Sequence, residues 1–198
     1  MVSRPDRGRT MHYFLLGPSG VGKTYFGNWL EANRQYHHIR VDNGDHGSEL
    51  QREKRLWSLW QQGNPKTPFE TSPLFIQLGA QFSDELQRCA ERNGKDDCVL
   101  TFWSYTVFAP SEIEALAGYN IVVRYLYGPK EKCIDSAFGR DAEKWSHDKG
   151  QARAHWCKHN KTHQRMGGPG LSDYRADIIE PAGSRLSGEE IAQLLNIA

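Results

Sequence analysis

The chain has 198 residues, of which 38% are hydrophobic and 25% are charged, a balance typical of one globular domain with a substantial core. Its formal net charge of +1 excludes a strong overall attraction to nucleic acid or to an anionic membrane surface. Because the sequence has no run of about 18 apolar residues, we expect no membrane-spanning helix.

The first ten residues are polar and no apolar signal core follows them, so we expect a cytoplasmic protein. The four cysteines are widely scattered, which favours reduced thiols over a disulfide framework. Five short apolar runs then predict buried strands along the chain: His12–Leu16, His38–Val41, Cys98–Trp103, Ile121–Tyr127 and Ala176–Glu180.

Helical character is found in the stretches that separate and follow these strands: Lys23–Asn33, Ser48–Gln61, Ser83–Asn93, Ser111–Ala117, Lys130–Phe138 and Ser187–Ile197. Ser111, with Glu114 three residues later, and Ser187 are predicted to cap their helices. Strands that alternate with helices indicate a three-layer α/β fold, in which helices cover both faces of a parallel sheet.

Two segments interrupt this alternation. Residues 45–82 combine one aromatic helix with a proline-rich loop, whereas residues 139–171 carry seven Lys or Arg against three Asp or Glu, a net charge of +4. Insertions at the ends of a parallel sheet often cover substrates. We therefore expect a single domain over residues 1–198, with an acceptor cover at about 45–82 and a basic lid at about 139–171.

A phosphate-binding motif lies between the first predicted strand and the first predicted helix. The sequence GPSGVGKT matches G-x-x-x-x-G-K-[ST] in full, and its glycines allow backbone N–H groups to converge on phosphate oxygens. The helix that begins near Lys23 adds its positive end, the Lys23 ammonium is expected to reach the β- and γ-phosphates, and the Thr24 hydroxyl is expected to bind Mg²⁺. The predicted nucleotide-binding residues are Gly17, Pro18, Ser19, Gly20, Val21, Gly22, Lys23 and Thr24.

Other classes of nucleotide-binding protein with this motif are excluded by what is missing. A switch GTPase needs an Asn-Lys-x-Asp base reader, and the nearest match, Asn160-Lys161-Thr162-His163, lacks the aspartate. A motor or AAA-type ATPase needs an apolar strand that ends in acidic residues, yet Asp96 and Asp97 precede the third strand. A small kinase remains.

The chain resembles P-loop kinases of the nucleoside-monophosphate, shikimate and gluconate kinase type over residues 11–197. The resemblance is carried by Gly17–Thr24, by Asp42-Asn43-Gly44-Asp45-His46, by Val122–Tyr127 with the helix that reaches Arg140, and by Ile178–Gly183. It implies sheet order 2-3-1-4-5, ATP·Mg²⁺ as donor, in-line phosphoryl transfer, and an acceptor under the 45–82 insertion. The run 103–108 departs from the acceptor-gripping turns of these kinases, so we expect a different acceptor pocket.

Three side chains are predicted to carry the chemistry: Lys23, Asp42 and Arg140. Asp42 stands at the end of a predicted strand, where it is a candidate either to bind Mg²⁺ through water or to accept a proton from the acceptor hydroxyl; a plain turn before Asn43-Gly44 is the structural alternative. In the resemblance, an arginine at the position of Arg140 opens the lid and touches the transferring phosphate. Arg153 and Arg165 are alternatives within the basic segment, since a guanidinium meets phosphoryl charge with paired donors.

The histidine-rich run from His155 to His163 could bind zinc, but no C-x-x-C pair accompanies it. Contacts of these histidines with phosphate or with solvent are therefore the favoured interpretation. Trp57 and Trp60 share a helix face, which favours core packing over an acceptor pocket; Trp103 and Tyr105 fit either role.

The leading hypothesis is a kinase that phosphorylates a small hydroxyl-bearing metabolite, with neither membrane nor nucleic acid as partner. The alternatives are a nucleoside-monophosphate kinase and an ATP-binding regulatory module without transfer chemistry.

Overall fold

The computed structural model describes residues 11–41, 49–63, 76–102, 104, 106–180 and 183–197. Its strands are β1 (His12–Leu16), β2 (Tyr36–Arg40), β3 (Asp97–Thr101), β4 (Ile121–Tyr127) and β5 (Arg175–Asp177). Its α-helices are α1 (Lys23–Asn33), α2 (Glu49–Arg52), α3 (Lys54–Gly63), α5 (Gly79–Arg92), α6 (Pro110–Ala117), α7 (Lys130–Arg140), α8 (Lys149–His159), α9 (His163–Met166) and α10 (Gly188–Leu195). Two 3₁₀ turns complete the described elements: η1 (Ala142–Trp145) and η2 (Pro169–Tyr174).

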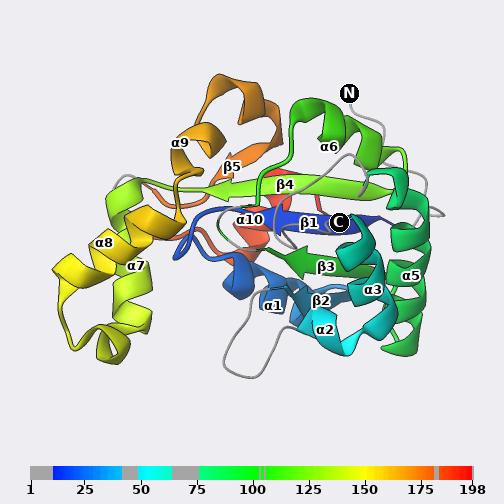
Figure 1. Cartoon of the computed structure of the whole chain (residues 1–198), viewed down its shortest axis with the longest axis horizontal. Coiled ribbons are helices and arrows are strands. Elements are labelled where there is room, and N and C mark those ends of the chain that lie inside the picture. The colour runs from blue at the N-terminus through cyan, green and yellow to red at the C-terminus, as the bar shows by residue number, and fades with distance from the viewer. Residues whose placement is uncertain are drawn as a thin grey trace.

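The five described strands form one sheet in the order β2-β3-β1-β4-β5, and every neighbouring pair is parallel. This confirms the predicted parallel sheet and its order. The arrowheads of β1, β3 and β4 point toward the end of the molecule that carries α7 and α8 (Figure 1). Ligands of parallel α/β proteins bind outside the carboxyl ends of the strands, so this end is where a site is expected.

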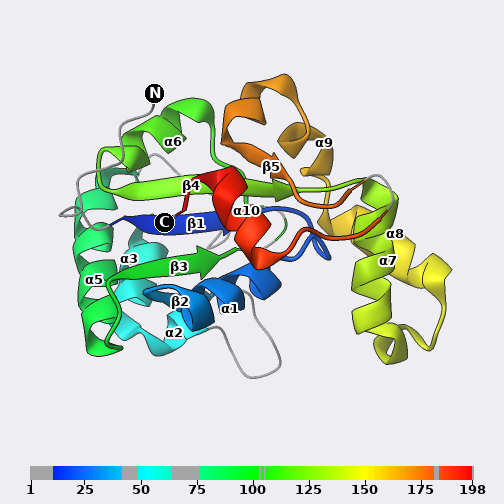
Figure 2. The same cartoon turned by 180° about the vertical axis from the view of Figure 1, so that it is seen from behind.

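Helices cover both faces of the sheet, as the alternation of strands and helices predicts. One face packs on apolar side chains of α1, α7 and α10, among them Phe26, Leu30, Ile134, Ile191 and Leu195. Figure 2 shows α10 and α1 in front of the sheet. The opposite face packs on α2, α3, α5 and α6, through side chains that include Leu50, Leu56, Trp60, Phe82, Leu86 and Ile113. Among the described helices, none is both long enough and apolar enough to cross a membrane.

The ends of β2, β3, β5 and α5 lie a few residues from the expected positions, and α8 forms where no helix was expected. Two further local predictions also differ from the structure. The helix expected over Ser48–Gln61 is divided at Glu53 into α2 and α3, and this bend accompanies full burial of both Leu50 and Trp60. The cap expected at Ser111 is wrong: α6 begins at Pro110, and the Glu112 carboxylate accepts a hydrogen bond from the Ala109 N–H at 2.6 Å. Proline suits the first helical position because its φ is already helical, so the helix starts one residue earlier. The Ser187 cap is confirmed.

Two buried histidines connect elements of the core. Nδ1 of His12 accepts a hydrogen bond from the Cys98 N–H at 3.1 Å. The His38 ring bridges two elements, with Nδ1 2.9 Å from Asn28 Oδ1 and Nε2 3.0 Å from Thr101 Oγ1. Burial lowers the pKa of each histidine to about 4, because desolvation disfavours the charged ring. Both rings are therefore neutral in the folded protein near neutral pH.

We expect the free energy of unfolding to decrease as the pH falls from 6.5, the ordinary histidine pKa, toward about 4. In this window the unfolded chain binds protons that the folded chain does not, so acid favours unfolding. Each histidine contributes at most about 3 kcal/mol. Burial raises the pKa of Asp97 to about 6. Asp97 therefore acts in the opposite direction, because its contribution to the free energy of unfolding is present at low pH and is lost as the pH rises through about 6.

Urea unfolding at several pH values checks this expectation. His38→Gln should show a shallower pH dependence than wild type, because one of the two buried rings no longer titrates. The matched control is His147→Gln, since His147 lies exposed in the basic segment, and it should keep the wild-type slope. Equal slopes for all three proteins would contradict the assignment of the acid sensitivity to buried histidine.

Candidate phosphate-binding site

The glycine motif forms the loop that joins β1 to α1. Gly20 and Gly22 have φ values of 82° and 116°, a region that L side chains rarely adopt. Gly20 also lies against α7, because a Cβ atom built on it would stand 2.1 Å from the Cys133 carbonyl oxygen. The loop therefore needs glycine here for both its bend and its contact with α7. Successive backbone N–H groups in such a bend form an anion-binding concavity.

Lys23 lies at the first position of α1 and folds back over the loop. Its Nζ donates hydrogen bonds to the carbonyls of Gly17 at 2.8 Å and Pro18 at 3.0 Å. The ammonium is thus held over the first half of the loop, close to the amino-terminal end of α1, where the helix dipole is positive. Thr24 follows Lys23 and borders the same cavity. A cation, the positive end of a helix and a hydroxyl are therefore gathered at one point.

A cavity of about 390 Å³ opens at the phosphate loop. Its walls come from four separate parts of the chain: the loop with the start of α1, the end of β3, the last turns of α7, and the turn before α10. The lining residues are Ser19, Gly20, Gly22, Lys23, Thr24, Tyr25, Phe102, Ser104, Ser136, Arg140 and Arg185. The fold therefore brings the predicted Arg140 to the same cavity as Lys23 and Thr24.

Arg140 is the only one of the three predicted lid arginines that borders this cavity, among the described residues. It is 64% exposed and pairs with Asp141 at 2.7 Å, and this pairing lowers the pKa of the Asp141 carboxyl. Arg153 instead pairs with Glu131 on the outer surface between α8 and α7. Arg165 lies exposed on α9. Of these three arginines, Arg140 is therefore the one that shares a cavity with Lys23 and Thr24.

Arg185 is a second cavity arginine, which sequence reasoning missed. Its Nη2 donates to the Gly20 carbonyl and to Ser136 Oγ, both at 3.0 Å, and its guanidinium lies 5.7 Å from the centre of the Tyr25 ring. It follows the Ile178–Gly183 run, which the resemblance places beside the adenine base. The position of Arg185 just after that run was the one sequence feature that pointed to the site. A single arginine in a turn belongs to no periodic pattern, so the residue was not predicted.

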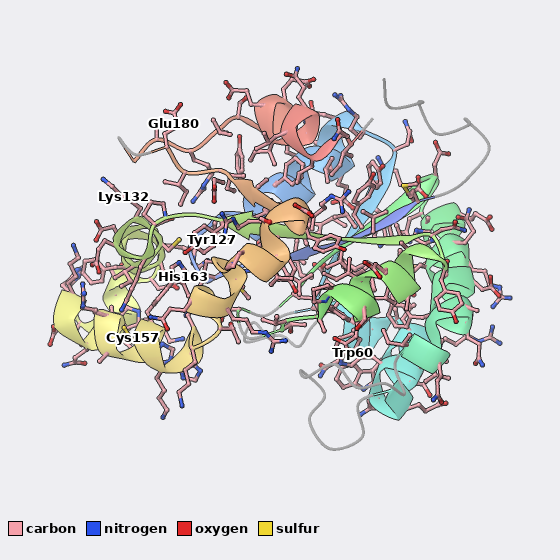
Figure 3. The ribbon with its side chains drawn as sticks, turned by 90° about the horizontal axis from the view of Figure 1, so that it is seen from above. Trp60, Tyr127, Lys132, Cys157, His163 and Glu180 are labelled. Carbon is pink, nitrogen blue, oxygen red and sulfur yellow. The ribbon has the colours of Figure 1, made fainter. Side chains whose placement is uncertain are left out.

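Three histidines of the basic segment, His155, His159 and His163, pack against other rings. His163 stacks on Tyr127 at 4.8 Å between ring centres, and its Nε2 lies 3.1 Å from the Gly128 carbonyl oxygen. Figure 3 shows His163 beside Tyr127, far from Trp60 on the other side of the molecule. His155 packs on His159 at 4.2 Å. Across the described ranges, no three His, Cys, Asp or Glu side chains are grouped so as to hold a metal.

Several predicted residues lie outside the described ranges: Asp42, Asp45, Trp103 and Tyr105. Trp60 is described and is fully buried against Phe82 and Phe102, so its core interpretation is confirmed. Trp57 is partly buried and packs on the same cluster. The segment 45–82, where the acceptor cover is expected, is therefore described only over residues 49–63 and 76–82.

Comparison with known proteins gives structural likeness only. No protein-family model and no curated protein matches the chain. Among solved structures, shikimate kinase from Acinetobacter baumannii in complex with shikimate is 17% identical, covers 94% of this chain and 93% of its own, and has a TM-score of 0.43. The tunicamycin resistance protein of Deinococcus radiodurans is 16% identical, with 94% of each chain covered and a TM-score of 0.47.

A gluconokinase from Sinorhizobium meliloti 1021 is 14% identical, covers 96% of this chain and 90% of its own, and has a TM-score of 0.41. These values are low, so the assignment rests on the protein's own geometry. A five-stranded parallel sheet in the order β2-β3-β1-β4-β5, with a glycine loop and Lys23 between β1 and α1, is the arrangement that the sequence resemblance implied. The chain has the fold of the P-loop small-molecule kinases.

Proposed function

We propose that the protein is a kinase that transfers the γ-phosphoryl group of ATP to a small hydroxyl-bearing metabolite. The observation that carries this proposal is the cavity that joins the phosphate loop, Lys23 and Thr24 to Arg140 and Arg185. Guanidinium groups beside the loop suit phosphoryl transfer, because negative charge spreads over the phosphate oxygens in the transition state and a guanidinium stabilises it.

The residues at the loop fit ATP and Mg²⁺. Gly20 and Gly22 have positive φ values that give the loop its bend, and Lys23 already holds its ammonium across the loop through the carbonyls of Gly17 and Pro18. We propose that Lys23 pairs with the β- and γ-phosphates and that the Thr24 hydroxyl, with Asp42 through water, holds the metal. When bound, Mg²⁺ would neutralise phosphate charge and orient the γ-phosphoryl group.

Arg140 and Arg185 line the same cavity from different elements, and each is proposed to meet phosphate charge there. Arg140 stands at the end of α7, from which the basic segment begins, so movement of that segment would carry its guanidinium toward or away from the transferring group. Arg185 is bonded to the loop itself through the Gly20 carbonyl, which suits a fixed contact with the nucleotide. Positioning of the reactants and neutralisation of phosphate charge are the main contributions of a protein to phosphoryl transfer.

The alternative proposed role of Asp42, in place of the contact with a metal-bound water, is to orient or deprotonate the acceptor hydroxyl. Asp42 directly follows Val41, whose N–H donates to the Thr101 carbonyl at 2.9 Å, at the carboxyl end of β3. Parallel strands place that end on the same edge of the sheet as the phosphate loop. We propose that the acceptor lies under the 45–82 segment and that residues 139–171 close over the donor as a lid, which would exclude water from the transfer.

The nucleoside-monophosphate kinase alternative predicts arginines that grip an acceptor phosphate. Within the described part of the 45–82 segment, Arg52 and Arg55 are the arginines present, and neither borders the cavity. A hydroxyl-bearing acceptor without a phosphate is therefore the better supported substrate class.

Replacement of Arg140 tests the proposed transfer chemistry. Arg140→Ala should lower kcat by about 10²-fold, because one preorganised donor to the transition state is lost, and should raise the Kd for ATP·Mg²⁺ much less. Arg153→Ala is the matched control, since Arg153 also forms an exposed pair with a carboxylate but borders no part of this cavity. Equal turnover by the two variants would contradict the role of Arg140.

A further inference from the structure

Two side chains of the basic segment are hydrogen-bonded to the backbone of the phosphate loop. The indole Nε1–H of Trp156 donates to the Ser19 carbonyl at 2.9 Å, and Oδ1 of Asn160 accepts from the Ser19 N–H at 2.7 Å. Both groups are buried, each residue being 4% exposed. The N–H and the carbonyl of one loop residue are therefore both held by the carboxyl end of α8.

The two side chains form one unit, which we call the Ser19 clasp (Trp156 and Asn160). Asn160 Nδ2 donates to the Trp156 carbonyl at 2.8 Å, so the members of the clasp are also bonded to each other. The indole ring packs edge-on against His163 at 5.4 Å between ring centres. The clasp thus has its own support and does not depend on Ser19 for its geometry.

The same part of the chain is tied to the end of β3. Ser104 Oγ donates to the His159 carbonyl at 3.2 Å, and Thr162 Oγ1 donates to the Ser104 carbonyl at 2.8 Å. Ser104 and Ser19 both border the phosphate cavity. Figure 1 shows the end of α8 that precedes α9 lying toward the sheet, with η1 at the far tip of the α7–α8 pair. One end of the basic segment is therefore anchored on the site.

We propose that Trp156 and Asn160 are positioning residues that fix the phosphate loop in its nucleotide-binding shape and couple nucleotide affinity to α8. This inference rests on the proposed function, because it assumes that the loop binds ATP. Ser19 precedes Gly20, which has a φ of 82°. Because glycine has no side chain, its own backbone dihedral angles are weakly restricted, and the loop shape depends on neighbouring contacts. The peptide groups on either side of Ser19 are set by the clasp, so the direction of the following N–H groups depends on it.

The coupling has a reciprocal consequence. If the clasp favours the loop shape that binds nucleotide, bound nucleotide must stabilise the clasp by the same factor. ATP·Mg²⁺ should therefore slow backbone amide exchange in α8, although no residue of α8 lines the phosphate cavity. A purely structural pair of hydrogen bonds would give no such response to ligand.

Two conservative variants test the clasp by direct measurement of the Kd for ATP·Mg²⁺. Trp156→Phe removes the indole donor and keeps an aromatic ring, and Asn160→Ala removes the acceptor for the Ser19 N–H. Each should raise the Kd by roughly three- to tenfold, the effect of one lost internal hydrogen bond. Each should also weaken the exchange protection that ATP gives to α8.

Matched controls separate positioning from loss of stability. Tyr125→Phe keeps the buried ring but removes the hydroxyl that accepts a hydrogen bond from the Phe108 N–H at 2.8 Å, and Asn93→Ala removes a side-chain bond to the Cys89 carbonyl at 2.8 Å. Neither residue borders the cavity, so both controls should lower the melting temperature while leaving the Kd unchanged. Clasp variants that melt early but bind ATP as wild type does, or bind it more tightly, would overturn the inference. Failure of the wild-type protein to bind ATP would instead refute the proposed function.

Discussion

Lys23→Ala should lower the rate of phosphoryl transfer by about 10²–10³-fold, the usual effect of removing one preorganised charge partner of a transition state. The variant loses the ammonium that lies across the loop, while the fold keeps every element of its core. The lost bonds to the Gly17 and Pro18 carbonyls should cost only about 1 kcal/mol of stability, since both lie at a partly exposed position. The measurement is ADP release under saturating ATP·Mg²⁺, with the melting temperature recorded for each protein.

Lys95→Ala provides a closely matched control at the other end of α1. Lys95 Nζ donates to the carbonyls of Glu31 at 2.8 Å and Arg34 at 3.4 Å, the same type of contact that Lys23 makes with the loop. Both variants therefore remove a lysine bound to two backbone carbonyls, but only one removes a cation from the cavity. If Lys95→Ala lowered turnover as strongly as Lys23→Ala, the effect would be one of folding and the role of Lys23 would be wrong.

Gly20→Ala should both destabilise the protein and abolish tight nucleotide binding. The added Cβ would stand 2.1 Å from the Cys133 carbonyl oxygen and 2.9 Å from the Ala137 nitrogen, so α7 would have to move away from the loop. Overpacking of this kind costs about 1–3 kcal/mol beyond the strain of a positive φ. Because α7 carries Ser136 and Arg140 into the cavity, its displacement should weaken ATP binding at least about tenfold.

Gly94→Ala isolates the backbone strain from the steric contact. Gly94 also has a positive φ, of 66°, but a Cβ built there would meet no atom within 4 Å. It should cost about 1 kcal/mol and leave nucleotide affinity unchanged. The difference between the two variants in urea unfolding measures the contact of the loop with α7. Equal losses of stability would mean that α7 adapts without cost and that its approach to the loop is not fixed.

Local patterns were sufficient to predict the elements that build the sheet. β1, β4 and α1 begin and end where the sequence analysis expects, because a buried apolar run and a glycine motif each have a clear signal in neighbouring residues. The order of the strands came from the family resemblance, since nothing local states which strands pair. The start of α6 was misjudged because Pro110 and Ser111 both signal a helix start and the proline prevailed.

The site was predictable where the motif is contiguous and was missed where the fold assembles it. Gly17–Thr24 could be read directly, and Arg140 was found from its place in the resemblance. Arg185 and the Ser19 clasp join residues more than 130 positions apart, and such contacts depend on how α7, α8 and the turn before α10 pack. No periodicity or spacing in the sequence carries that information.

The most direct test of the kinase assignment is ADP release from ATP·Mg²⁺ in the presence of an acceptor library. The library should contain sugar acids, aminoglycoside-like sugars, nucleosides and nucleoside monophosphates, and wild type should be assayed beside Lys23→Ala and Lys95→Ala. We predict that one class of hydroxyl-bearing acceptor raises turnover in wild type and Lys95→Ala but not in Lys23→Ala. If ATP binds and no acceptor raises turnover above the Lys23→Ala background, phosphoryl transfer to a small molecule is contradicted.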